Sequence, residues 1–147
     1  MNTPPIRAPK EGRPVITMTS LGVNGRFANQ LFQYAFLKTY ALRHDLRVET
    51  PPWIGNVLFG ASDPLPSRPL QLVKQEGHDP DTDPVAAAAA PLRDVDLWGY
   101  FQYHTKYYAP FRDYIRRLFT PVPEISAALS PALERLRART ETGGCGV

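Results

Sequence analysis

A strand, a glycine-rich loop, a helix and a second strand follow one another directly within residues 15–50. We expect the strands over Val15 to Ser20, which is rich in β-branched residues, and over Leu46 to Thr50, where apolar and polar residues alternate. The loop, Leu21 to Ala28, holds glycines that tolerate positive φ. The helix is expected from Asn29 to Arg43, because apolar side chains recur there every fourth residue. This order predicts an α/β fold, with a Rossmann-like parallel sheet and flanking helices.

Prolines divide the remainder of the chain into long connections and a few regular elements. The sequence contains 16 prolines, six of them between Trp53 and Pro91, and we expect mostly loop in that segment. A third strand is predicted over Val95 to Phe101. Aromatic and apolar residues at helical spacing predict a helix over Tyr107 to Phe119. The Ser-Pro pair at residues 130–131 indicates the N-terminus of a last helix over Ala132 to Arg139.

Composition argues against several classes of protein. A formal net charge of +3 is too small to indicate a nucleic-acid partner. The single cysteine, Cys145, cannot form an internal disulfide, which favours a reducing compartment. The chain shows neither the apolar region of a signal peptide nor 18 consecutive apolar residues, so we expect no transmembrane segment. These observations predict a cytoplasmic protein, in which a peripheral membrane contact remains open. His44, His78 and His104 lack the spacing of metal ligands, so no metal is expected.

The junction between the first strand and the first helix is the candidate binding site. Its residues, Gly25, Arg26, Phe27, Asn29 and Gln30, combine a cation and two side-chain amides with the unpaired amides of a helix start. The helix dipole and a bidentate arginine both favour a diphosphate, and Asn29 can cap the helix or bind sugar hydroxyls. The alternative is an ordinary β-to-α turn with a surface arginine.

Two stretches of the sequence resemble one known family. Gly-Arg-Phe-Ala-Asn-Gln-Leu-Phe-Gln-Tyr-Ala-Phe, residues 25–36, is similar to the Gly-x-x-Gly-Asn-Gln-x-Phe-Gln-Tyr-Ala signature of α-1,2-fucosyltransferase-like proteins, glycosyltransferase family 11. Trp-Gly-Tyr-Phe-Gln-Tyr, residues 98–103, with Lys-Tyr-Tyr at 106–108 and Ile-Arg-Arg-Leu-Phe at 115–119, resembles a second run of that family. The family's second glycine is replaced by Ala28, which narrows backbone freedom if that position needs positive φ.

The resemblance implies a division of the chain into segments. Residues 1–14 are expected to be a Pro-rich disordered leader, and residues 15–142 the N-terminal, acceptor-side domain of a two-domain GT-B glycosyltransferase. Residues 143–147 are expected to begin the linker or strand to a missing C-terminal donor-binding domain. The family's His-x-Arg-Arg-x-Asp motif, which acts on the GDP-sugar, does not occur in these 147 residues. The chain is therefore expected to be a truncated N-terminal fragment that is inactive alone.

The activity that the resemblance implies is transfer of fucose from GDP-fucose to a glycan hydroxyl by an inverting mechanism. The nucleotide-sugar donor and the glycan acceptor are the expected ligands, with no cofactor and no metal. Tyr100, Gln102 and His104 follow a predicted strand and are candidate cleft residues, although His104 also suits an exposed position near a helix cap. The catalytic base is not assigned.

Two other functions stay open. Gly22, Gly25 and Ala28 form a G-x-x-G-x-x-A pattern, and Glu49 ends the second strand where an NAD(P)-type dinucleotide-binding domain places its ribose-binding acid. That pattern does not match the full G-x-G-x-x-G fingerprint. The other alternative is a noncatalytic glycan-binding or assembly module, which the absence of the family's donor motif would explain.

Overall fold

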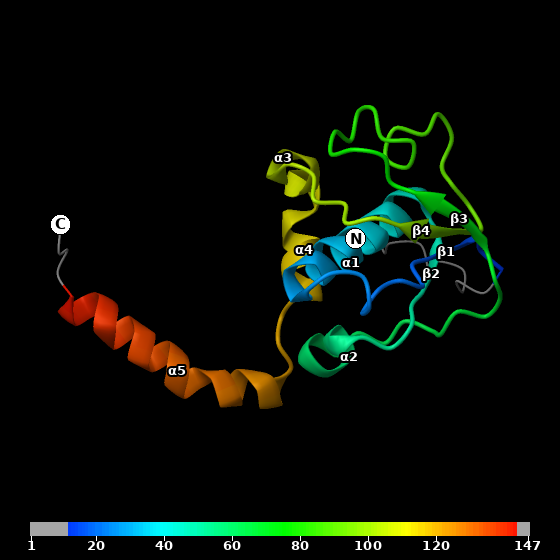
Figure 1. The fold of residues 1–147 in the computed structure, drawn as a ribbon. Helices are drawn as coiled ribbons and strands as arrows, with labels where there is room; N and C mark the ends of the chain where they lie inside the picture. The colour runs from blue at the N-terminus through cyan, green and yellow to red at the C-terminus, as the bar shows by residue number, and fades with distance from the viewer. Residues whose placement is uncertain (1–11, 144–147) are drawn as a thin grey trace, which may run out of the picture.

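Four short parallel strands form one sheet in the computed structural model, which describes residues 12–143 (Figure 1). The strands lie in the order β2-β1-β4-β3, and each neighbouring pair is parallel. Their bounds are β1 (Val15–Thr17), β2 (Arg47–Glu49), β3 (Gln71–Lys74) and β4 (Val95–Trp98). The prediction of an α/β fold built on a parallel sheet is confirmed.

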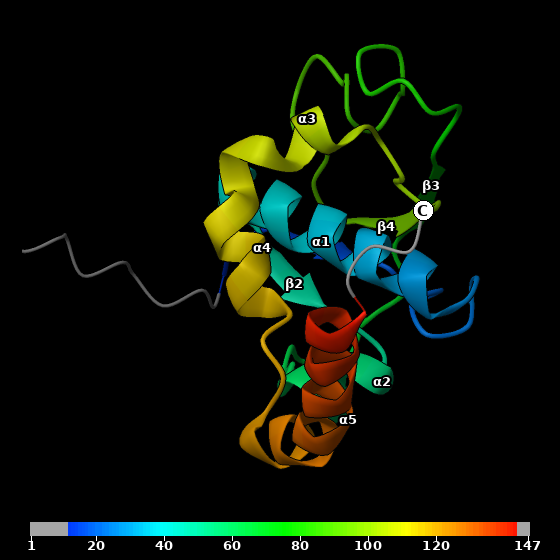
Figure 2. The ribbon, with the colours of Figure 1, turned by 90° about the vertical axis from the view of Figure 1, so that its left-hand side faces the viewer.

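Five helices accompany the sheet in the described part of the chain. Their bounds are α1 (Phe27–His44), α2 (Ile54–Phe59), α3 (Thr105–Tyr108), α4 (Arg112–Leu118) and α5 (Pro123–Thr142), and a 3₁₀ turn, Ala109–Phe111, joins α3 to α4. α3 and α4 lie alongside α1, whereas α5 projects away from the sheet (Figures 1 and 2). Among residues 12–143, the helices are too short or too polar to cross a bilayer.

The two faces of the sheet differ in chemistry. Parallel register places Ile16, Val48 and Leu97 on one face, where they join the buried core with residues of α1 such as Phe36. Phe36 also stacks on Phe101, with 4.1 Å between ring centroids. The opposite face carries buried polar residues, Thr17, Glu49 and Asp96. The α1 side therefore supplies most of the hydrophobic stabilisation.

Hydrogen bonds satisfy the carboxylates on the polar face. Glu49 accepts hydrogen bonds from the backbone N–H of Ser67 at 2.8 Å and from Nη2 of Arg47 at 2.7 Å. Asp96 accepts from the backbone N–H of Thr19 at 2.8 Å and also from its hydroxyl. A buried carboxylate is tolerated only when such donors replace water. Asp96 thereby holds the segment that leaves β1 against β4.

The strand and helix boundaries near the N-terminus differ slightly from the predicted ones. α1 begins at Phe27, two residues earlier than expected, and ends before Asp45, which adopts a left-handed φ of 55°. Arg13 and Pro14, assigned to the leader, are ordered against the sheet: Arg13 pairs with Asp45 at 2.7 Å, and the Pro14 carbonyl accepts from the N–H of Arg47. Residues 1–11 of the predicted leader and residues 144–147 of the predicted linker lie outside the described residues.

The segment from Trp53 to Pro91 is mostly loop, as predicted, but it contains two short elements that the sequence did not predict. α2 forms there because the Asn56 side chain accepts from the backbone N–H of Trp53 at 2.7 Å, and Gly60 ends the helix with a left-handed φ of 67°. β3 forms at the edge of the sheet by pairing with β4. Its pairing depends on a strand some 20 residues away, so local pattern carries little signal for it.

The predicted helices of the C-terminal part also have different bounds. Residues 107–119 do not form one helix, because Pro110 lies in the 3₁₀ turn that separates α3 from α4. α5 starts at Pro123 and continues through Pro131, so the Ser130 side chain does not cap a helix; it donates to the Ser126 carbonyl at 2.9 Å. No residue of α5 is buried, which agrees with its projection in Figure 1.

Candidate functional site

The loop between β1 and α1 is held by two buried glutamines of the helix. Nε2 of Gln33 donates to the Asn24 carbonyl at 3.0 Å, and Nε2 of Gln30 reaches the Gly25 carbonyl at 3.4 Å. Gln33 is fully buried and Gln30 is 9% exposed. Gln30, predicted as a ligand-binding residue, therefore supports the shape of the loop from beneath. Gly25, Arg26 and Phe27 are exposed to solvent, as are Val23 and Ala28.

Gly25 occupies a position where a larger residue would be crowded. Its φ is +80°, a left-handed conformation that side chains disfavour. A Cβ placed there would lie 2.5 Å from Nδ2 of Asn29 and 2.8 Å from Cε1 of Tyr100. The backbone at Gly25 is thus in close contact with both α1 and the segment that follows β4. Ala28, by contrast, lies in α1 without a positive φ, so an alanine at this position causes no backbone strain.

The two stretches that carry the family resemblance meet beside Gly25. Nε2 of Gln102 donates to Oδ1 of Asn29 at 2.5 Å, although the two residues are 73 positions apart. Asn29 lies in the first turn of α1, and it is not the cap that the sequence suggested. Together with Tyr100, these side chains gather at the carboxyl ends of the adjacent strands β1 and β4. Ligands of open parallel sheets bind outside this end.

Arg26 presents an unpaired cation at the same place. It is the N-cap residue of α1, with an extended backbone, and no side chain caps the first turn. The guanidinium is exposed and makes no hydrogen bond or ion pair with any residue in the range 12–143. The first turn of α1 also contains no acidic residue. The free amides, the helix dipole and the guanidinium therefore all favour an anion at this surface.

His104 is engaged in local structure. It is exposed, and its Nδ1 accepts from the backbone N–H of Lys106 at 3.2 Å, which makes it the N-cap of α3. The structure places no hydrogen bond between His104 and the Asn29–Gln102 pair. His104 therefore matches the alternative interpretation, an exposed histidine near a helix cap.

Buried tyrosines surround the site but are not available as bases. Burial raises the pKa of Tyr103 and that of Tyr108 well above the usual value; the Asp83 carboxylate raises the pKa of Tyr103 further, and neighbouring tyrosines add to the effect at both. The Tyr108 hydroxyl donates to the Phe101 carbonyl. Both phenols stay protonated at physiological pH. Their role is to support the segment that carries Gln102.

Gln75 also positions this segment, a role that the sequence pattern did not indicate. Its Oε1 accepts from the backbone N–H groups of Tyr100 and Phe101 at 2.9 and 2.8 Å. Phe101 is fully buried with a positive φ of 53°, so two external hydrogen bonds at this bend stabilise an unusual backbone. Gln75 follows β3, which local pattern did not reveal. Gln33, in contrast, lies within residues 25–36, the first stretch that carries the family resemblance.

Glu49 bears on the dinucleotide-binding alternative. Glu49 is 2% exposed, and both carboxylate oxygens already accept hydrogen bonds from Ser67, with Arg47 as a further donor. A ribose would have to displace these donors to reach the carboxylate. The described geometry therefore offers little support for Glu49 as a ribose-binding acid.

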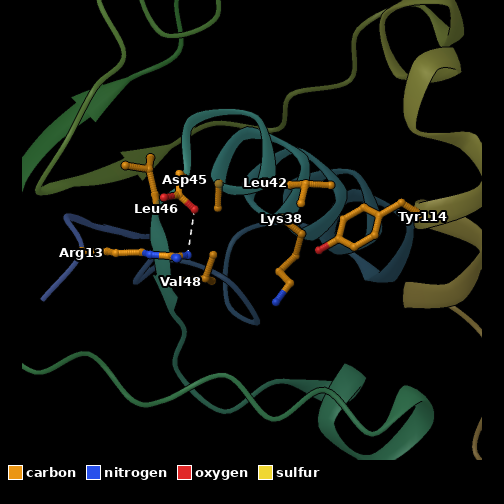
Figure 3. A pocket seen from close by; sticks show the side chains of 8 residues that line it. Arg13, Lys38, Leu42, Asp45, Leu46, Val48 and Tyr114 are labelled. Carbon is orange, nitrogen blue, oxygen red and sulfur yellow. Dashed lines mark ion pairs between the residues drawn. The ribbon is translucent and has the colours of Figure 1, made fainter. Parts of the chain in front are cut away.

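A separate hollow lies at the amino ends of β1 and β2 (Figure 3). The Arg13–Asp45 ion pair and Val48 border it, as do Lys38 and Tyr114. This is the end of the sheet opposite the β1–α1 loop. The hollow therefore does not belong to the candidate site. Within residues 12–143, no cluster of three or more histidine, cysteine or acidic side chains is placed to hold a metal ion.

Comparison with protein-family models, with curated proteins and with solved structures finds no match to this chain.

Proposed function

We propose that this chain is the acceptor-side part of a cytoplasmic glycosyltransferase of GT-B organisation, which transfers fucose from GDP-fucose to a glycan hydroxyl. One contact carries the proposal: Gln102 donates to Asn29 and so joins the two stretches that resemble the fucosyltransferase-like family. The joined residues lie at the sheet end where ligands of parallel folds bind. An unpaired arginine and a free helix start lie next to them.

The arrangement suits the charge that develops in an inverting transfer. The acceptor oxygen forms a bond to the anomeric carbon, the bond from that carbon to the diphosphate breaks, and GDP leaves with the electron pair. The acceptor proton passes to a general base, to which we assign no residue. Negative charge grows on the diphosphate, and Arg26 with the first amides of α1 would stabilise it. Groups fixed before the reaction stabilise such charge without reorganisation.

The polar side chains at the same edge suit a sugar. Tyr100 and Gln102 are exposed, and Asn29 is partly exposed. Side-chain amides and an aromatic hydroxyl provide both donors and acceptors for sugar hydroxyls. An exposed aromatic ring also offers a flat apolar surface to a sugar ring. This combination favours a sugar ligand over a dinucleotide. A dinucleotide would need the Glu49 carboxylate to bind its ribose, but that carboxylate already accepts hydrogen bonds from Ser67.

The test is a product assay with the complete gene product. The protein is incubated with GDP-fucose and a panel of glycans, and the glycans are analysed by mass spectrometry. We expect the mass of one acceptor to rise by one fucosyl residue, and no change with GDP-mannose or without enzyme. Absence of product across the panel, together with glycan binding by calorimetry, would establish the noncatalytic alternative. Tight NADH binding measured by fluorescence would favour the dinucleotide alternative.

A further inference from the structure

An apolar hollow lies between the first half of α1 and the α3–α4 segment. Leu31, Phe32 and Ala35 form one wall, and Tyr108, Ile115 and Phe119 form the other. The hollow has a volume of about 260 Å³ and opens to solvent. Its surface contains no polar area, although Thr105 lies at its edge. An open, wholly apolar recess of this kind favours an apolar ligand.

A second hollow adjoins the first; its lining is also mainly apolar, but it includes cationic side chains. The two share Thr105, Tyr108 and Ile115, and the second is also bordered by the cations Lys106, Arg112 and Arg116. Its volume is about 490 Å³, so the pair reaches the roughly 300–1,000 Å³ of small-molecule sites. The acidic residue nearest in sequence, Asp113, does not line either hollow. The recess is therefore mainly apolar, and three cations border one of its ends.

The three cations have no anionic partner in the described structure. Lys106, Arg112 and Arg116 are exposed, and none of their charged groups makes a hydrogen bond or ion pair with residues 12–143. Arg112 and Arg116 are one turn apart on α4, so both guanidinium groups reach the same hollow. Several cations facing one recess repel each other, and a bound anion removes that repulsion.

We propose that this recess binds an anionic single-chain amphiphile, namely an alkyl or prenyl phosphate. The hydrocarbon chain lies between α1 and α4 against Phe32 and Ile115, and the phosphate lies among the cations. The apolar end removes hydrocarbon from water, and guanidinium groups form strong charge-assisted hydrogen bonds with phosphate oxygens. This binding is independent of the transfer proposed above, so either proposal can fail without the other.

Calorimetric titration of the 147-residue chain with decyl phosphate, below its micellar concentration, tests the proposal. We expect one saturable site, binding at least tenfold weaker for decyl maltoside, and no detectable binding of inorganic phosphate. Arg116→Ala should weaken decyl phosphate binding at least fivefold. The matched control is Arg137→Ala, which removes an exposed arginine of α5 and should leave binding unchanged.

A second variant examines the apolar end. Ile115→Gln keeps a similar side-chain length, and it should weaken decyl phosphate at least fivefold while circular dichroism shows an unchanged fold. If Ile115→Gln unfolds the chain, the Arg116→Ala comparison decides alone. Equal binding to the Arg116→Ala and Arg137→Ala variants would overturn the proposal. So would equal affinity for the neutral amphiphile, or binding only to anionic phospholipid vesicles and not to the monomer.

Discussion

At the residue scale, the contacts around Gly25 make a quantitative prediction. Gly25→Ala places a Cβ 2.5 Å from Asn29 and 2.8 Å from Tyr100, at a φ of +80°. The left-handed backbone costs an alanine about 1–2 kcal/mol, and crowding adds about 1–3 kcal/mol. We expect the free energy of unfolding in urea to fall by about 2–5 kcal/mol.

The matched control is Gly77→Ala, since Gly77 has a similar φ of +88° but no atom within 4 Å of the added Cβ. Its loss of stability should be about 1–2 kcal/mol, from backbone strain alone. Equal losses for the two variants would show that Tyr100 and Asn29 do not press against the loop at Gly25.

His44 gives the stability of the chain a pH dependence of known sign. Desolvation lowers its pKa below 6.5, with further contributions from Arg43 and Arg93. The unfolded chain therefore binds a proton more readily than the folded chain, and stability falls as the pH drops through about 6.5. Urea unfolding between about pH 7 and pH 5 should show this fall, before most carboxylates titrate.

The His44→Gln variant removes the titrating group and should have a flatter profile over the same range. His44 packs against Tyr40, so the variant is expected to lose some stability at all pH values. A profile as steep as that of the parent chain would assign the pH dependence to other groups.

The sequence predicted the residues of the candidate site better than their roles. Gly25 and Arg26 were identified because glycine and arginine at a strand–helix junction carry a local signal. The contact between Asn29 and Gln102 joins residues 73 positions apart, and no periodicity reports such a pairing. Gln30 was expected to face a ligand because it lies in the same motif as Arg26, whereas it is buried and bonds to the Gly25 carbonyl.

At the element scale, prediction succeeded where burial is strong and one-sided. α1 and the central strands β1 and β4 are largely buried, so apolar residues recur along each of them. β3 was missed because it is an exposed edge strand, and α2 because its six residues include Gly55 and it is stabilised by Asn56. Such elements depend on tertiary pairing and capping more than on propensity.

α5 contains a proline in its interior, and this predicts a local effect of substitution. Pro131 has no N–H to donate, which weakens a helix by about 3 kcal/mol relative to alanine. Pro131→Ala should therefore slow amide hydrogen exchange across the middle of α5. Because no α5 residue is buried, the free energy of unfolding of the sheet should change by less than about 0.5 kcal/mol. A large change in global stability would show that α5 packs against the body.

At the scale of the whole molecule, α5 also exposes a row of leucines. Leu129, Leu133 and Leu136 lie at helical spacing and are 46%, 48% and 57% exposed. Exposed apolar stripes promote association, so we expect the chain to self-associate at micromolar to millimolar concentration in sedimentation experiments. Replacing all three leucines with Gln should restore a monomer. Leu65→Gln is the control, since Leu65 is 64% exposed and outside the row; a monodisperse parent chain would contradict the prediction.

Turnover of the Arg26→Ala variant in the complete gene product tests the central claim, that Arg26 and the start of α1 stabilise the leaving diphosphate. Arg26→Ala removes one charge-assisted contact that is strongest in the transition state. This should raise the activation free energy by roughly 2–4 kcal/mol, which lowers kcat/KM about thirty- to a thousandfold. Arg26→Lys should recover little, because lysine lacks the bidentate fork.

The melting temperature should stay the same, because Arg26 is exposed and pairs with no residue in the described part of the chain. Arg137→Ala, on the exposed face of α5, is the control and should change neither turnover nor melting. We expect a large loss of turnover for Arg26→Ala and none for Arg137→Ala. Equal turnover of the Arg26→Ala and Arg137→Ala variants would contradict it and make the β1–α1 junction an ordinary turn with a surface arginine.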